Sequence, residues 1–563
     1  MRRLGTAAPV AIGLAVIFAW LFDPFTLRWG VDAIWLAAVA VWSGTVWTLR
    51  RRGARWQPRN AIPLAILLAV FCAAWLPFFD NWRWAFTGDS VAWFEVPYNA
   101  GRDGIHQSLL SVRGVDENFT YLHSIAPNAL MVLIEPNMFW HRVGKLMVSV
   151  AGLASIYLFF VLTIGRAWAL VVIFAVATNY VWIWFSYVSY GHVASYVVAF
   201  LSLAFATMTW RAPENPVNWL ACGLIGGLSL FFTQTAWAEV AAVGIALTVG
   251  AARLRRPDLW AIYAVAFLLV ALPYGMQWED VSAMFTRNAA GSQPVDAAYW
   301  VRIFQEILVL PLTSETYDLG VYRGFLRPPL DWLYVAGAGV ALLGVHPRLR
   351  RALHIPGVAP VVLALLLFDA VLMTFTNNAY GNISTKRAYH LIPYYLFLAL
   401  LPCMVVQMSV RGWVSHGAWA LTAAALALYV SANARLVITP PQAMYGFTVF
   451  DGLIELRQRY PQQLVALFTS RGPEFANAVL SAESVVAREY KVTDIVVLEP
   501  RIDADGLADA CASQALLCYE PEFDEEAFTN MVAPYGPQLS TVEFYNSHDM
   551  RCFWPLPSSA GTG

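Results

Sequence analysis

Long apolar runs separated by short polar or charged connections dominate the chain. Most runs extend over roughly 15 to 20 residues, enough to cross about 30 Å of hydrocarbon as a helix whose backbone groups bond to one another. Because a second run follows the first closely and no small-residue cleavage site is evident, the first is predicted to be a span and not a cleaved signal. The pattern predicts about thirteen membrane-spanning helices, at residues 8–22, 31–49, 61–78, 144–164, 167–186, 190–209, 217–235, 237–252, 259–275, 329–345, 357–376, 390–408 and 413–431.

Two long loops, 79–143 and 276–328, interrupt the predicted spans. They contain three apolar segments: "HQSLLSVRG" from residue 106, "NALMVLIEPNMFW" from 128 and "AAYWVRIFQEILVLPL" from 297. The segments are too brief to cross a bilayer and suit helices that lie in the membrane interface. We therefore expect the first loop to lie flat on the membrane and roof a cavity.

Beyond residue 431 the sequence becomes more polar. "LVALFTS" and "DIVVLEP" have the character of buried strands, whereas "FANAVLSAESVVAREY" has helical spacing. These patterns predict a small α/β domain. The expected organisation is a transmembrane hairpin at 1–60, a transmembrane body at 61–431 and a soluble domain at 432–563.

Composition and the placement of arginine give the chain an orientation. With 59% hydrophobic and 13% charged residues, it lacks the polar surface of a soluble globular protein. The arginine-rich connections fall on one side when every span is counted, and short basic loops are cytoplasmic as a rule. They are "MRR", "RRRGARW", "RLRRPD" and "HPRLRRALH". The N-terminus is therefore expected in the cytoplasm, and the long loops and the tail outside it.

The six cysteines divide into two groups. Three lie within or beside spans, where a thiol acts as a small hydrophobe. The other three, Cys511, Cys518 and Cys552, lie in the tail, where an oxidising compartment would allow a bridge between Cys511 and Cys518. The odd third thiol leaves that pairing open.

Several of these features together resemble the GT-C superfamily of integral-membrane glycosyltransferases. They are an acidic residue soon after an early span, the segment "HSIAPNAL" from residue 123, and the long apolar stretch that begins "FWHRVGKLMVSV". Over about 60–430 the layout is similar to the protein O-mannosyltransferases and the aminoarabinose transferase. The resemblance implies an all-α polytopic fold, a polyprenyl-phosphate sugar donor, an inverting reaction outside the cytoplasm, and an acidic catalytic base in the first long loop.

The predicted base is Asp89, which stands alone where the family usually has adjacent acidic residues. Transfer of a sugar to a hydroxyl or amine needs a base near the acceptor proton. Asp116 and Glu117, the acidic pair later in the loop, are the alternative. Asp89 would instead cap an interfacial helix if "TGDS" is a helix start.

The leaving phosphate needs cationic groups, and "KRAYHLIPYY" supplies Lys386, Arg387 and Tyr389 directly before a late span. Arg142, at the start of another span, is a second candidate. Both segments have a plainer interpretation, because basic and aromatic residues commonly anchor helix ends at the interface.

Three further polar residues stand at span ends or inside spans. His192 and Glu239 are candidates for contact with the substrate, and Asp369 lies deeper in a span. Ionisable residues at such depth are costly and usually face a cavity or a partner. Each of the three is equally compatible with a structural hydrogen bond or ion pair.

Sequence motifs for other chemistries are missing. The chain has no phosphate-binding Gly-rich loop, no HExxH, and no histidines at metal-ligand spacing. Some GT-C enzymes use a divalent cation and others do not, and the isolated Asp89 favours a reaction without metal.

The predicted function is transfer of a monosaccharide from a polyprenyl-phosphate donor to a glycan, lipid or protein acceptor at a bacterial plasma membrane, with no nucleic-acid partner. A transporter or flippase of lipid-linked sugars, with Asp369 as its main candidate residue, is one alternative. A membrane assembly factor of the cell envelope is another.

Overall fold

The structure is a computed structural model. It describes residues 2–50, 62–75, 88–113, 120–187, 194–232, 236–283, 296–313, 326–377, 389–410 and 412–438, with short segments of the tail at 464–468, 495–498, 513, 515–519, 530, 539–542 and 551–555. The chain divides into two compact units, residues 1–81 with 99–444, and residues 82–98 with 445–563.

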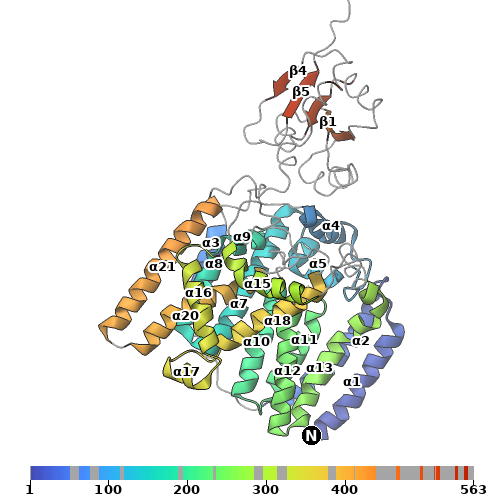
Figure 1. Cartoon of the computed structure of the whole chain (residues 1–563). Helices are drawn as coiled ribbons and strands as arrows, with labels where there is room; N and C mark the ends of the chain where they lie inside the picture. The colour runs from blue at the N-terminus through green and yellow to red at the C-terminus, as the bar shows by residue number, and fades with distance from the viewer. Residues whose placement is uncertain are drawn as a thin grey trace, which may run out of the picture. The chain divides into compact units, whose positions relative to one another are not determined.

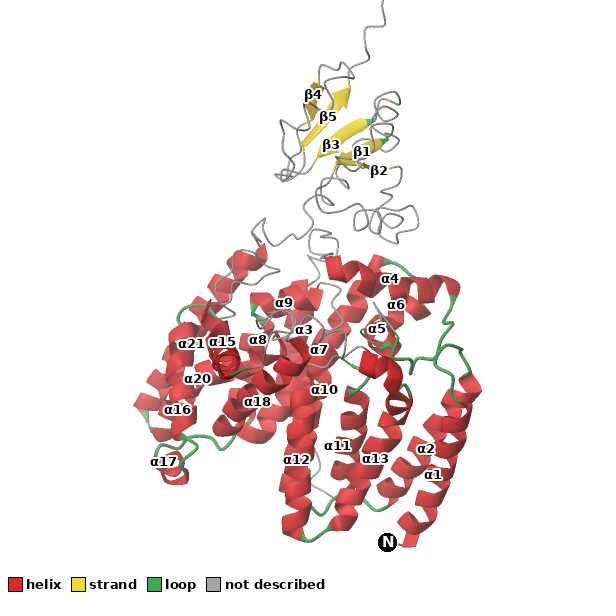
Figure 2. Ribbon diagram, turned by 45° about the vertical axis from the view of Figure 1, so that its right-hand side comes forward, coloured by secondary structure: helices red, strands yellow, loops and turns green. Residues whose placement is uncertain are grey.

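The first unit is helical (Figures 1 and 2). Its first half contains α1 (Arg2–Leu21), α2 (Trp29–Thr48), α3 (Ile62–Trp75), the end of α4 (Gly88–Asp103), α5 (Tyr121–Ile125), η5 (Ala126–Asn128), α6 (Ala129–Leu133), α7 (Met138–Ile164), α8 (Arg166–Ala177), α9 (Tyr180–Tyr187) and α10 (Ser195–Arg211). Its second half contains α11 (Pro216–Ser229), α12 (Trp237–Leu254), α13 (Pro257–Met276), α15 (Ala297–Thr313), α16 (Leu330–Leu343), α17 (Pro347–Ala352), α18 (Ala359–Asn377), η9 (Tyr389–Leu391), α20 (Ile392–Ser409) and α21 (Trp413–Ile438).

This is a helical, multi-pass membrane protein. Within the described residues, six helices are long and apolar enough to cross a membrane: Trp29–Thr48, Phe139–Ile164, Trp237–Leu254, Pro257–Met276, Ile392–Ser409 and Trp413–Arg435. Shorter apolar helices occupy Ala7–Leu21, Ile62–Ala73, Arg166–Ala177, Leu330–Leu343 and Ala359–Leu372. Helices overlap every predicted span, while the total of thirteen crossings stays a prediction.

One predicted span, 167–186, is two helices. The chain leaves α8 at Thr178, and α9 starts after Asn179, whose side-chain oxygen accepts a hydrogen bond from the Trp182 amide at 3.0 Å. Asn179 also donates to the Tyr429 hydroxyl on α21 at 2.7 Å. An asparagine that caps a new helix and bonds to a neighbouring one explains why the continuous apolar run does not form a continuous helix.

The predicted interfacial helix in "HQSLLSVRG" is wrong, because this segment forms turns. Leu110 and Val112 are buried in a cluster with Phe18 and Phe231. The side chain of Gln277 accepts from the Val112 amide at 2.9 Å and donates to the Leu110 carbonyl at 2.8 Å. These bonds satisfy backbone groups that a helix would have paired internally. The segment from Ala297, by contrast, does form a helix, α15.

Helix directions place the N-terminus and the arginine-rich turn at 253–256 at one end of this unit. Early in α2, Trp35 donates to the Leu269 carbonyl late in α13 at 2.9 Å. Further along α2, Trp42 donates to Ile262, which comes earlier in α13, at 3.4 Å. The two helices are therefore antiparallel, and the N-terminus of α1 lies at the same end as the turn between α12 and α13, which carries Arg253 and its basic neighbours (Figures 1 and 2).

Close helix contacts position α20 in the interior. Residues 392–401 of α20 are all buried. At Gly337 on α16, an added Cβ would lie 1.8 Å from the Leu398 carbonyl oxygen, so only glycine permits this crossing. The Tyr395 hydroxyl of α20 donates to the Ile307 carbonyl of α15 at 2.8 Å. These contacts fix the start of α20.

The second unit contains a five-stranded sheet, drawn yellow in Figure 2. The strands are β1 (Val465–Phe468), β2 (Ile495–Leu498), β3 (Leu516–Tyr519), β4 (Leu539–Val542) and β5 (Arg551–Pro555), in the order β2-β1-β3-β5-β4. β1 is parallel to β2 and β3, and β5 is antiparallel to β3 and β4. Both segments predicted as strands, in "LVALFTS" and "DIVVLEP", are strands, whereas the predicted helix at 475–490 lies outside the described residues.

Candidate functional site

Three of the residues predicted from the sequence have described side chains, Arg142, Glu239 and Asp369, and all three are buried. Two others lie in described helices: Asp89 is the second residue of α4, and Tyr389 is the first of η9. Asp116, Glu117, His192, Lys386 and Arg387 lie outside the described residues. The roles of all these residues stay predictions.

Arg142 belongs to a group of buried basic side chains at the start of α7. Asn137 caps this helix, because its side-chain oxygen accepts from the Trp140 amide at 3.0 Å. Arg142 and Lys145 follow three residues apart, which places them on one face of the helix. Arg142 is 4% exposed and Lys145 is fully buried. Sequence reasoning missed Lys145, although the chain has only three lysines and this one directly precedes an apolar run.

The segment before α7 adds histidine to this group. The η5 turn packs directly on α7, since a Cβ on Gly144 would lie 2.5 Å from the Pro127 carbonyl oxygen. Just upstream, His123 is buried beside the ring of Phe232. Burial, with the positive charge of Lys145 as the smaller cause, lowers the pKa of His123 to about 3. His123 is therefore neutral at physiological pH.

His141 completes what we call the basic cluster: His123, His141, Arg142 and Lys145. His141 is 1% exposed and lies within electrostatic reach of both Arg142 and Lys145. An arginine, a lysine and two imidazoles thus share one buried region. Side chains of this kind suit contact with a negatively charged group.

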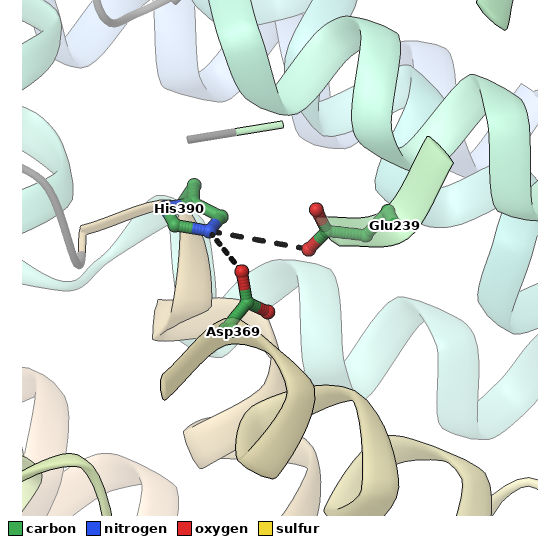
Figure 3. A group of neighbouring side chains, drawn as sticks. All are labelled: Glu239, Asp369 and His390. Carbon is green, nitrogen blue, oxygen red and sulfur yellow. Dashed lines mark hydrogen bonds and ion pairs between the residues drawn. The ribbon is translucent and has the colours of Figure 1, made fainter. Parts of the chain in front are cut away.

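Glu239 belongs to a second buried group, which we call the acidic triad: Glu239, Asp369 and His390 (Figure 3). Glu239 is in the first turn of α12, Asp369 is in the second half of α18, and His390 is in η9 just before α20. His390 Nε2 lies 3.3 Å from Asp369 Oδ1 and 4.0 Å from Glu239 Oε1. Tyr394 donates its hydroxyl to Glu239 Oε1 at 2.9 Å.

The basic cluster and the acidic triad lie toward the same end of the helical unit, opposite the arginine-rich turn at 253–256. Glu239 is at the start of α12 and this turn follows the end of α12, and α18 meets α12 at the acidic triad. α7 and α10 run in the same direction, because Gly152 faces Tyr196 and the carbonyl of Leu162 accepts from Arg211. α10, α11 and α12 alternate in direction, which places the starts of α7 and α12 at one end.

Comparison with known proteins found similarity in structure. No family model matches the chain, and no curated protein matches it. ArnT from Cupriavidus metallidurans, in a structure bound to undecaprenyl phosphate, is 14% identical with a TM-score of 0.45, over 89% of this chain and 100% of that one. The oligosaccharyltransferase of Archaeoglobus fulgidus in its apo form is 10% identical with a TM-score of 0.43, over 84% of this chain and 71% of that one.

The same oligosaccharyltransferase in a complex with Zn and sulfate is 11% identical with a TM-score of 0.43, over 84% of this chain and 69% of that one. ArnT, an aminoarabinose transferase, and this oligosaccharyltransferase are both GT-C glycosyltransferases.

Proposed function

We propose that this protein transfers a monosaccharide from a polyprenyl-phosphate donor to a glycan, lipid or protein acceptor on the extracytoplasmic side of the membrane. The observation that carries the proposal is the basic cluster. Arg142 and Lys145 are buried one helical turn apart where the first long loop enters α7. A lipid-linked phosphate at the membrane surface is an anion that reaches such a position.

Burial argues against the plainer interpretation of Arg142 as an interfacial anchor. An anchoring arginine keeps its guanidinium among lipid headgroups and water. Arg142, at 4% exposure, is inside the protein instead, together with the fully buried Lys145. In this position both cations would contact the donor phosphate and stabilise the negative charge that develops as it leaves.

The proposed reaction needs one base and one leaving group. The acceptor hydroxyl or amine attacks the anomeric carbon, the bond from that carbon to the phosphate oxygen breaks, and polyprenyl phosphate departs. The base takes the acceptor proton. We assign this role to Asp89, with Asp116 or Glu117 as the alternative, because a carboxylate is the group the first loop offers.

Two features support an extracytoplasmic site. The N-terminus and the arginine-rich turn at 253–256 lie at the end of the helical unit opposite the basic cluster, as expected if that end faces the cytoplasm. Cys518, in the tail, is disulfide-bonded. Structural disulfides persist in oxidising compartments, which supports a position of the proposed soluble domain outside the cytoplasm.

The test uses purified protein in lipid nanodiscs with undecaprenyl phosphate and its radiolabelled sugar derivatives. Lys145→Met should weaken binding of undecaprenyl phosphate about 10- to 100-fold, because a hydrogen bond to a charged group contributes about 1.5–3 kcal/mol. Asp89→Asn should bind normally and transfer sugar about 10²- to 10⁴-fold more slowly. Arg166→Met, which changes an exposed arginine at the start of α8, is the matched control and should behave as wild type.

Normal binding of undecaprenyl phosphate by Lys145→Met would show that the basic cluster is not part of the donor site. Normal transfer by Asp89→Asn would shift the base to Asp116 or Glu117. A wild-type protein that transfers no sugar but moves lipid-linked sugar across a vesicle membrane would support the transporter instead.

A further inference from the structure

The acidic triad carries more negative charge than its ion-pair partners among the described residues neutralise. Glu239 and His390 are fully buried and Asp369 is 1% exposed. Among the described residues, the only ion pairs of either carboxylate are those with His390. Even a protonated His390 leaves one negative charge on buried side chains. Such a buried charge is costly unless another cation or a proton compensates it.

Each carboxylate also has one oxygen with nothing to bond to. In the part of the chain that the structure describes, Glu239 Oε2 and Asp369 Oδ2 are buried and have no hydrogen-bond partner. Their other oxygens, Glu239 Oε1 and Asp369 Oδ1, are the ones directed at His390 (Figure 3). Buried acceptors without donors are rare in proteins, and one recognised explanation is an ion at the site.

The spacing of the three side chains suits a metal ion. One ligand atom from each residue lies within 4.8 Å of the other two. Bonds of about 2.0–2.2 Å to Zn²⁺ require ligand atoms roughly 3.3–3.6 Å apart in a tetrahedron. The separation of 3.3 Å between His390 and Asp369 already meets this. Glu239, at 4.0 Å from His390 and within 4.8 Å of Asp369, would move closer to both to complete the site.

We propose that Glu239, Asp369 and His390 bind one divalent transition-metal ion of the Zn²⁺ class. The inference goes beyond the proposed function and does not depend on it, because it rests on the triad alone. An imidazole with two carboxylates selects zinc or manganese over magnesium and calcium, which prefer all-oxygen ligands. A water molecule or a substrate oxygen would supply the remaining ligand.

Bound there, the ion would join three elements that are far apart in sequence. α12, α18 and the start of α20 each contribute one ligand. Tyr394, one turn into α20 from His390, already orients Glu239 through its 2.9 Å hydrogen bond. Such a bond from outside the ligand set fixes the orientation of a carboxylate ligand and strengthens metal binding.

The first measurement is the metal content of wild-type protein purified in detergent without chelator. Mass spectrometry of the elements should find about one zinc or manganese per chain. Asp369→Asn and Glu239→Gln keep the size of each side chain and should reduce that content to background. Tyr394→Phe should retain the site with an affinity for Zn²⁺ about 10- to 100-fold weaker. His416→Gln, at an exposed histidine on α21, is the matched control and should keep its metal.

A second measurement needs no variant of the triad. Wild-type protein stripped with a chelator should bind Co²⁺ with the visible absorption of a site that contains nitrogen and oxygen ligands, and Zn²⁺ should displace it. Zn²⁺ should also restore the thermal midpoint that the chelator lowers. Mg²⁺ should neither displace Co²⁺ nor restore the thermal midpoint.

Three results would overturn the proposal. They are a wild-type protein that neither contains nor takes up a transition metal, equal metal content in Asp369→Asn and wild type, and a Co²⁺ spectrum that survives both carboxylate substitutions. The first would indicate that a proton held between the carboxylates compensates the charge. None of these readouts uses a sugar donor, so they are independent of whether the glycosyltransferase proposal succeeds.

Discussion

At the scale of single residues, the protein keeps ionisable groups where water does not reach them. Lys145, His123 and Glu239 are each fully buried. Burial removes the hydration that stabilises a charge, so each group must lose its charge or gain a partner. Such residues are expensive in stability, which is why the basic cluster and the acidic triad are the places to look for function.

His123 should make the protein less stable in mild acid. Its pKa is about 3 in the folded protein and about 6.5 when unfolded. The unfolded chain therefore binds a proton between these values while the folded chain does not, and stability falls as the pH drops below about 6.5. Because of this residue, the free energy of unfolding should be about 2 kcal/mol lower at pH 5 than at pH 7.5.

The measurement compares thermal midpoints in detergent at pH 7.5 and pH 5. His123→Phe should show a smaller loss on acidification than wild type, whatever its stability at pH 7.5. His416→Gln, at an exposed site, should lose as much as wild type. If the thermal midpoint of His123→Phe fell on acidification as much as that of wild type, the His123 imidazole would not be the group that resists protonation.

Part of each cluster could be predicted from the sequence. Glu239 and Asp369 were recognised because carboxylates near or within apolar runs are costly. His390 was not, although it is in the segment "KRAYHLIPYY", because nothing in the local pattern shows that it faces residues 21 and 151 positions earlier. The search for histidines at metal-ligand spacing failed for the same reason, since the triad assembles through folding.

At the scale of elements, apolar length predicted the helices well and long-range polar contacts accounted for the errors. The run at 167–186 is uniformly apolar except near Thr178 and Asn179, so its break depends on the partner Tyr429 in a distant helix. Similarly, a hydrogen bond from Gln277, which lies more than 160 residues later in the chain, stabilises the turns at Leu110. No local pattern reveals either contact.

The crossing of α16 and α20 gives an element-scale prediction. Gly337→Ala would place a Cβ 1.8 Å from the Leu398 carbonyl oxygen, and a helix backbone cannot yield that far without displacement. We expect the free energy of unfolding to fall by about 1–3 kcal/mol or more, since overpacking of a tight contact destabilises a protein by this amount. Because α20 carries Tyr394, the displacement should also weaken metal binding at the triad.

Gly339→Ala, on the same helix, is the matched control. A Cβ added at Gly339 would meet nothing within 4 Å. The variant should be neutral or slightly stabilising, since alanine favours helix more than glycine does. Thermal midpoints of both variants in the same detergent check the prediction. Equal midpoints for Gly337→Ala and Gly339→Ala would contradict the close crossing.

At the scale of the whole molecule, the sidedness of the chain connects the two proposals. Helix directions place the basic cluster and the acidic triad toward the end opposite the arginine-rich turn at 253–256. If these arginines face the cytoplasm, both sites lie toward the outer side of the membrane, as the proposed function requires. The sequence predicts this sidedness from charge, whereas the burial of each site depends on the packing of the helices.

The disulfide of Cys518 provides a test of that sidedness. A bond in the tail requires an oxidising compartment, whereas Cys72, Cys222 and Cys403 are free thiols in apolar helices. In protein extracted under alkylating conditions, peptide mapping without reductant should find Cys518 linked and those three thiols alkylated. The sequence allows Cys511 as the partner but leaves the pairing open, and the sheet register places Cys552 opposite Cys518 on β5.

Two variants distinguish these pairings. Cys511→Ser should free Cys518 for alkylation if the bridge closes the short loop, and Cys552→Ser should do so if it joins β3 to β5. Intact cells treated with a reductant and a thiol reagent that do not cross the membrane should then label the tail cysteines. Labelling of Cys518 without any reductant, or only after the cells are opened, would place the tail in the cytoplasm and with it reverse the proposed side of the reaction.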